Sequence, residues 1–166
     1  MAISVSIEGL DKLQITNEQL GLWAKKPFSG KAALRIKEIF AKENNKAFNS
    51  KGRSIGEKWK PLSLGYKAWK SKRFPNRPLL VLRGNLKASL TKTNSRLMIF
   101  NNRGGKKLIL GTRVPYANAQ NYGSRRRNLP KRRFVKITQK TADAWANEMR
   151  KDVEVAMTGS KRWQGR

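Results

Sequence analysis

The sequence contains no cysteine and no histidine. Without cysteine there is no disulfide framework and no thiolate zinc site, and without histidine the commonest general base and metal ligand are missing. Long apolar runs are absent too: the longest aliphatic run, Leu79 to Leu82, is far too short to span a bilayer. The first residues show neither the basic start nor the apolar core of a signal peptide, so we expect a protein made in the cytoplasm.

Acidic residues are scarce. The 166 residues include 38 Lys and Arg but only 10 Asp and Glu, which gives a formal net charge of +28 at pH 7. A compact domain with this charge repels itself, so a polyanion or a protein neighbour is expected to neutralise it. Nucleic acid is the first candidate partner, an anionic membrane surface is the weaker alternative, and we predict no membrane contact.

The scarcity is concentrated in the middle of the chain. No acidic residue lies between Glu57 and Asp143, and this acid-free segment, residues 58–142, holds 23 of the 38 basic residues. The pattern favours a surface that holds phosphates without reading bases, and a generally soluble basic surface is the alternative. Two-metal hydrolysis needs acidic ligands beside the phosphate contacts. We therefore predict a protein that is not an enzyme and that holds no metal or cofactor.

The densest group of cations is called the arginine cluster here. Guanidinium groups match phosphate geometry and keep their charge, so the cluster is predicted to contact DNA. Docking on an acidic protein neighbour is the alternative. The residues between its two halves, 128–130, suit an extended exposed loop. The cluster consists of Arg125, Arg126, Arg127, Lys131, Arg132 and Arg133.

Four aromatic residues alternate with lysines in the acid-free segment. Stacking on unpaired bases is one interpretation. Core packing is the preferred one, because this part of the chain has few other large apolar residues. The four are Trp59, Tyr66, Trp69 and Phe74.

Periodicity predicts the secondary structure. Alternation from Ile3 to Ile7 predicts a strand ending at Gly9, followed by a short helix over residues 16–26. Apolar stripes predict long helices at about 30–49 and 138–157, and shorter helices are expected near 63–72, 84–90 and 116–122. The Asn- and Gly-rich connector 101–105 predicts a hairpin between residues 97–100 and 107–110. The stripes comprise Ala33, Ile36, Phe40 and Ala47 in the first long helix, and Trp145, Met149, Val153 and Ala156 in the second.

Charged residues on the polar sides of these long helices are interpreted as ordinary surface charges. They include Arg35 on the first helix and Glu148 and Asp152 on the second. We also expect these two acids and Glu154 to pair with the basic segment of a neighbouring subunit. A single domain over residues 1–157 is predicted, followed by a flexible basic tail over 158–166.

Four short motifs occur in order within residues 56–137, about half of the chain. Together they resemble the phage virion morphogenesis, or tail completion, family of Mu-like and related tailed phages. Two family positions differ in the third motif, where Gln120 replaces a histidine and Asn121 a glutamine. Two differ in the fourth, where Arg133 replaces a proline and Lys136 a glycine. The motifs are Trp59-Lys60-Pro61-Leu62-Ser63, Leu82 to Ser89, Tyr116 to Gly123, and Arg132 to Val135.

The motif residues are interpreted as structural rather than catalytic. Gly84 and Gly123 are expected to serve backbone geometry, and Pro61, Ala117 and Gln120 are further motif positions. The residues expected in the core or in subunit contacts are Trp59, Leu62, Leu82, Leu86, Tyr116 and Phe134.

The resemblance implies an α+β fold, in which a small antiparallel sheet is packed by the two long helices around a loop-rich basic central segment. It also implies a virion protein of the head–tail neck, a homo-oligomeric ring of six subunits, or twelve as the alternative. Its partners would be a portal-side connector or adaptor, a tail terminator or tail tube protein, and genomic double-stranded DNA. The alternative function is non-sequence-specific nucleic-acid binding of the nucleoid or RNA-binding type.

Overall fold

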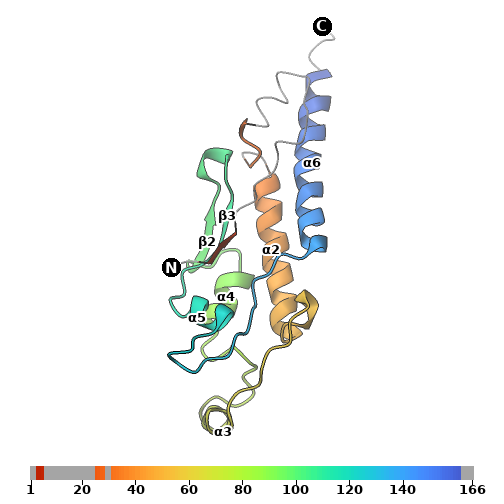
Figure 1. Cartoon of the computed structure of the whole chain (residues 1–166). Helices are drawn as coiled ribbons and strands as arrows, with labels where there is room; N and C mark the ends of the chain where they lie inside the picture. Colours follow the sequence, from red (N-terminus) through yellow and green to blue (C-terminus); the bar gives the residue numbers. More distant parts are fainter. Residues whose placement is uncertain (1–2, 6–24, 29–30, 162–166) are drawn as a thin grey trace.

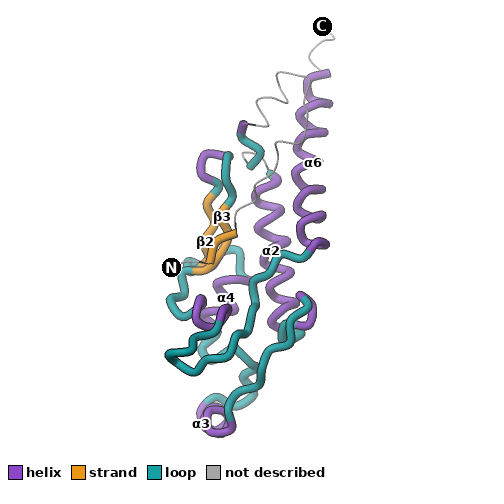
Figure 2. Tube along the Cα trace, viewed as in Figure 1, coloured by secondary structure: helices purple, strands orange, loops and turns teal. Residues whose placement is uncertain are grey.

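Two long helices lie side by side along the molecule and run in opposite directions (Figure 1). The computed structural model describes residues 3–5, 25–28 and 31–161. The first long helix, α2, spans Ala32–Asn49, and the second, α6, spans Gln139–Lys161. A small sheet lies beside α2, and the segment between the sheet and α6 is mostly loop (Figure 2). The predicted α+β class and the loop-rich central segment are therefore confirmed.

The sheet has three short antiparallel strands in the order β1-β3-β2. Strand β1 spans Ile3–Val5, β2 spans Met98–Asn101 and β3 spans Ile109–Thr112. The pairs Met98–Thr112 and Phe100–Leu110 set the register of the β2–β3 hairpin. Its connector holds a 3-10 turn, Arg103–Gly105, where Gly104 has a φ of 67°. The predicted hairpin is thus confirmed. Strand β1 matches the start of the predicted first strand, whereas the rest of that strand and nearly all of the predicted helix at 16–26 lie outside the described residues.

The apolar stripe of α2 faces the core as predicted, with Ile36 and Phe40 fully buried. In α6 Trp145 and Met149 are buried in the same apolar cluster. Helix α6 continues through Gly159 to Lys161, so the predicted domain boundary at residue 157 falls inside the helix. A glycine costs a helix only about 1 kcal/mol, which does not by itself end it. The predicted tail is therefore helical at 158–161, and residues 162–166 lie outside the described ranges.

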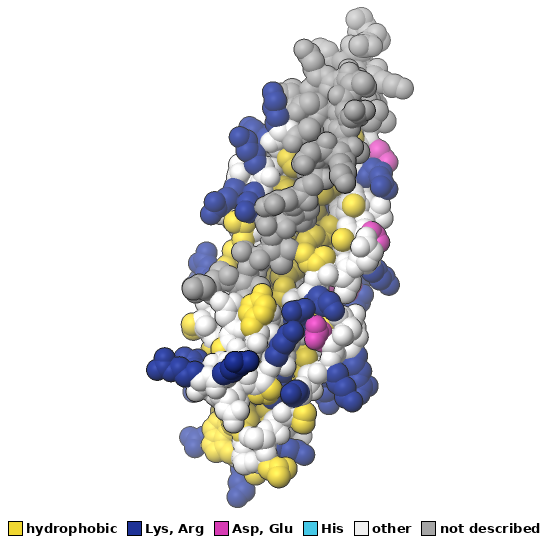
Figure 3. All heavy atoms as spheres, in the orientation of Figure 1, with side chains coloured by type: hydrophobic (Ala, Val, Ile, Leu, Met, Phe, Trp, Pro, Cys, Tyr) yellow, Lys and Arg dark blue, Asp and Glu magenta, His cyan; other side chains and the backbone are white. Residues whose placement is uncertain are grey.

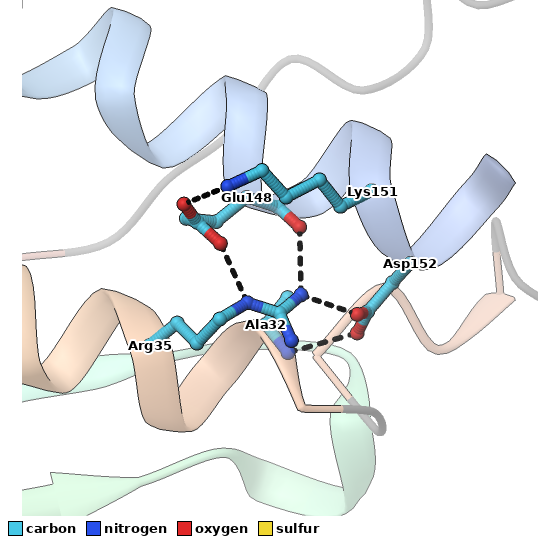
Figure 4. Close-up of polar contacts among 5 residues, drawn as sticks. All are labelled: Ala32, Arg35, Glu148, Lys151 and Asp152. Atoms are coloured by element: carbon cyan, nitrogen blue, oxygen red, sulfur yellow. Dashed lines mark hydrogen bonds and ion pairs between the residues drawn. The ribbon is translucent and has the colours of Figure 1, made fainter. Parts of the chain in front are cut away.

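An arginine clamp joins the two long helices (Figure 4). The Nε atom of Arg35 donates to Glu148 Oε2 and its Nη2 to Asp152 Oδ1, both at 2.5 Å. The other carboxylate oxygen of Asp152 accepts a hydrogen bond from the backbone N–H of Ala32 at 2.8 Å, at the first turn of α2. That N–H has no partner within its own helix, and a carboxylate there also suits the helix dipole. The interpretation of these three residues as ordinary surface charges is therefore wrong.

Two shorter helices lie between α2 and the hairpin in the chain, and a third lies between the hairpin and α6. They are α3 (Leu64–Arg73), α4 (Asn85–Thr91) and α5 (Ala117–Tyr122), each within two residues of its predicted position. Helix α4 lies against the sheet, and the hydroxyl groups of Ser89 and Thr112 share a buried hydrogen bond of 2.6 Å. Helix α3 lies at the far end of the molecule from the last turns of α6 (Figure 1). Within the described ranges, no helix combines the length and apolar content that crossing a membrane requires.

Protonation of Glu148 at acidic pH is expected to weaken the clamp. Hydrogen bonds from Lys151 and from Arg35 hold the pKa of Glu148 below its ordinary value of 4.5. A carboxylate with a lowered folded-state pKa adds stability that is complete above the unfolded pKa and is lost as pH falls through the folded one. Glu148→Gln should therefore lower the free energy of unfolding at pH 7 by about 1–2 kcal/mol. The difference from wild type should shrink as the pH falls below 4.5 and passes through the lowered folded-state pKa of Glu148.

Urea denaturation at a series of pH values measures this effect. The matched control is Glu43→Gln, which removes a carboxylate paired with Lys46 on its own helix. A loss of stability in Glu148→Gln that is the same at pH 3 and pH 7 would contradict the assignment.

Candidate nucleic-acid interface

The arginine cluster is divided by the fold. Arg125, Arg126, Arg127 and Lys131 are exposed. They lie on a loop over residues 124–131, called the basic loop here. Two backbone hydrogen bonds of 2.9 Å between Ser124 and Leu129 close this loop. The loop predicted from the sequence is therefore present, and four of the six cluster residues lie on its open surface.

Arg132 points into the protein instead. Only 4% of its surface is exposed. Its Nε donates to the carbonyl oxygen of Lys60 at 2.7 Å, and its Nη2 donates to that of Pro61 at 2.8 Å. Burial lowers the pKa of Arg132. The guanidinium is thus an internal strap between two of the sequence motifs, which corrects the prediction that Arg132 contacts phosphate.

Arg133 is half-buried, between the exposed cations of the basic loop and the buried Arg132. Its Nη1 lies 3.5 Å from Glu57 Oε1, an oxygen that also lies 3.7 Å from Lys136 Nζ. The backbone carbonyl of Arg133 accepts a hydrogen bond of 2.6 Å from the indole N–H of Trp59. Glu57 is the last acidic residue before the acid-free segment. The charge of Arg133 is therefore shared with a carboxylate of the same chain.

The motif residues form the frame beneath the loop. Trp59 and Phe134 are buried and both contact Phe48, with ring centroids 5.6 and 5.9 Å away. Gly123 has a φ of 81°, and a Cβ there would meet Leu129 O and Lys131 N at 3.0 Å. The structural interpretation is thus confirmed for the buried motif residues and for both glycines, since Gly84 also has a positive φ of 89°. The buried motif residues are Trp59, Leu86, Ala117 and Phe134.

Other motif positions are less enclosed. Leu62 and Leu82 are half-buried, Pro61 is exposed, and 43% of the surface of Tyr116 is exposed. A subunit contact at Tyr116 stays a prediction. Asn121, which the sequence did not single out as a structural residue, is fully buried and its Oδ1 accepts hydrogen bonds from the backbone N–H groups of residues 134 and 135 at 3.0 and 3.2 Å.

A groove of about 1430 Å³ lies between the basic loop, the start of α3 and residues 80–86. Among the described residues that line it there is no Asp or Glu, and three tyrosines contribute to its walls. Gln120 lines it too, and its buried Oε1 has no hydrogen-bond partner in the described part of the chain. The basic residues of the groove are Lys60, Lys70, Arg83, Arg125, Arg127, Lys131 and Arg132, and the tyrosines are Tyr66, Tyr116 and Tyr122.

The buried cations of this region are satisfied by backbone carbonyls rather than by carboxylates. Lys70 is 5% exposed, and its Nζ donates to the carbonyl oxygen of Pro78 at 2.7 Å. Burial lowers the pKa of Lys70. Arg132 is held in the same way. A carbonyl satisfies the donor without adding a formal negative charge, so these contacts do not cancel the positive charge of the groove.

The aromatic residues of the segment are also divided. Trp59 belongs to the core, but Tyr66 and Trp69 are 43% and 44% exposed. These two rings stack with their centroids 5.3 Å apart and their planes at 29°, and Phe74 lies 5.8 Å from Trp69. The core-packing interpretation is thus right for Trp59 and wrong for Tyr66 and Trp69. The reason is that α3 makes no extensive contact with any other described helix or strand.

Comparison of the chain with models of protein families, with curated proteins and with solved structures finds no match. The resemblance to the virion morphogenesis family therefore rests on its four short motifs. Among the described residues, no three acidic side chains are grouped so that they could hold a metal ion. The geometry and charge of the groove and its loop are the features that bear on function.

The two kinds of arginine should respond differently to mutation. Arg132→Gln is expected to lower the free energy of unfolding by about 2–3 kcal/mol, because a buried guanidinium and its two hydrogen bonds to backbone carbonyls are lost. Arg126→Gln, the matched control on the exposed loop, should change it by no more than about 0.5 kcal/mol. Urea denaturation followed by circular dichroism measures both. Equal effects of the two substitutions would contradict the role of Arg132 as a strap.

Proposed function

We propose that this protein is a structural, non-enzymatic component of a phage head–tail neck. It forms an oligomeric ring that joins a portal-side connector to the tail and contacts the double-stranded DNA that passes through. The observation that carries the proposal is the exposed basic loop at the edge of a groove without acidic residues. The ring, its partners and its place in the virion rest on the resemblance of the motifs.

The chemistry of the loop suits this task. Arg125, Arg126, Arg127 and Lys131 offer fixed positive charge and can hold phosphates in any register. DNA moving through a ring presents every base sequence in turn, so base readout would hinder it whereas phosphate contacts would not. Ring symmetry repeats the loop around the axis, and a few weak contacts from each subunit then add together.

A second function is favoured by one observation. The groove with its cations and tyrosines is complete within a single chain, so nucleic acid could be held without any ring. This supports the alternative of a non-sequence-specific nucleic-acid-binding protein of the nucleoid or RNA-binding type.

Assembly separates these two functions. We expect purified protein at near-physiological salt to form closed rings of six subunits, or of twelve, in mass photometry and negative-stain images. The rings should also add to tail-less heads or to free tails in an extract of infected cells. A stable monomer or dimer that coats DNA and never enters a particle would refute the neck proposal and favour the alternative.

The basic loop should dominate duplex binding. Replacing its four exposed cations with glutamine should weaken the binding of a 30-base-pair duplex and lower the slope of log K against log salt by about 3–4. The matched control removes the same charge at exposed lysines outside the groove. Fluorescence anisotropy over a range of salt concentrations measures both. Equal losses in the two variants would show that net charge, not the loop, binds DNA. The control variant replaces Lys31, Lys42, Lys51 and Lys140.

A further inference from the structure

Helix α3 exposes an unusual amount of aromatic surface for its size. The only fully buried side chain among its ten residues is Lys70. A helix of this length is marginal in water unless other parts of the structure support it. Large aromatic side chains usually bury most of their area, yet Tyr66 and Trp69 leave more than two fifths of theirs open. Such a surface indicates a partner that covers it.

Two exposed rings and one half-buried ring form a continuous series, called the aromatic ladder here. It consists of Tyr66, Trp69 and Phe74, with each ring within 6 Å of the next. Tyr66 also lines the basic groove, so the ladder begins where the groove ends. At this end of the molecule apolar side chains lie at the surface between Lys and Arg side chains (Figure 3).

The charge around the ladder selects the partner. No acidic residue occurs from residue 58 to residue 142, and Lys67, Lys72, Arg73 and Arg77 beside the rings are all exposed. The basic segment of a second copy would be repelled from this surface. A polyanion would be attracted to it.

The shape of the ladder favours nucleic acid over an acidic protein. A docked protein helix is generally held by apolar anchors at i, i+3, i+4 and i+7. On α3 the positions that follow Tyr66 and Trp69 in this series are Lys70 and Arg73. On α3 the only exposed aliphatic side chain of that size is Leu64, at 86%. Flat rings interleaved with cations are the composition of sites that bind single strands, where the rings stack on bases and the cations meet phosphates.

We propose that the aromatic ladder binds the unpaired bases of a single-stranded nucleic acid, whose phosphates follow the basic groove. This inference rests on the proposed contact with nucleic acid and extends it from duplex phosphates to unpaired bases. The bases of a duplex are stacked inside it and closed to the rings. The ladder therefore confers a preference for single strands that the basic loop alone does not have.

The test compares two probes on the full-length protein. A fluorescein-labelled 12-nucleotide oligo-dT and a 12-base-pair duplex are titrated against wild type and against a Tyr66→Ala/Trp69→Ala variant. Stacking contributes about 1–3 kcal/mol per base, so the variant should bind oligo-dT at least 10-fold more weakly. Its duplex affinity should change by less than about 2-fold, because the phosphate contacts on the basic loop remain.

Three controls keep the result specific. Circular dichroism checks that the variant is folded. Tyr66→Phe/Trp69→Phe keeps the rings and should retain oligo-dT binding. Leu64→Ala removes the neighbouring aliphatic side chain and should have no effect. In a second measurement, oligo-dT should quench tryptophan fluorescence in wild type, and Trp69→Phe alone should remove most of that quenching.

Several outcomes would overturn the inference. Oligo-dT binding by the alanine variant that equals wild type would overturn it. Fluorescence quenching that survives Trp69→Phe would overturn it too. Binding of a poly-glutamate peptide that is weakened by Leu64→Ala, without binding of oligo-dT, would assign the surface to an acidic protein. Loss of duplex binding only in the basic-loop variant, with no effect of the ladder on oligo-dT, would leave the proposed function standing and refute the ladder. Ladder-dependent binding by a protein that forms no ring would do the reverse.

Discussion

The small number of carboxylates limits every charged contact in this fold. Two of them, Glu148 and Asp152, pair with Arg35 and so join the two long helices, α2 and α6. The acid-free segment has no carboxylate of its own, and its buried cations Arg132 and Lys70 bond to backbone carbonyls instead. Because a carbonyl has no formal charge, the interior contacts leave the positive charge of this region uncompensated. The basic character of the groove is therefore a consequence of how the segment is held together, not only of its exposed residues.

The same contacts determine the geometry of the candidate interface. The Arg132 strap ties residues 60 and 61, just before α3, to the end of the basic loop. The indole of Trp59 adds a second tie in the same place, through the carbonyl of residue 133. The loop and the start of α3 both line one groove, and these ties fix their positions relative to each other. A rigid frame of this kind presents cations at set positions and loses little conformational freedom when a polyanion binds.

Local patterns in the sequence predicted most of the helices and the hairpin. The stripe through Ile36 and Phe40 and the Asn- and Gly-rich connector each act over a few residues, so they can be read without a structure. The roles of single charged and aromatic residues could not be read this way. Arg126 and Arg132 are chemically identical, and only carbonyls about 70 positions earlier decide that the second is buried. Likewise, periodicity showed that Arg35 lies on the polar side of its helix but not that a carboxylate pair lies opposite.

The clamp between the two long helices joins residues that are synthesised far apart in time. Arg35 and Glu148 are 113 positions apart, and β1 pairs with β3 across a similar stretch of chain. At a ribosomal rate of about 5–20 residues per second, α2 waits several seconds for the helix that covers its apolar face. The whole cationic middle of the chain emerges during that interval, before any carboxylate of α6 exists. The nascent chain therefore carries nearly all of its net positive charge before α6 can cover α2.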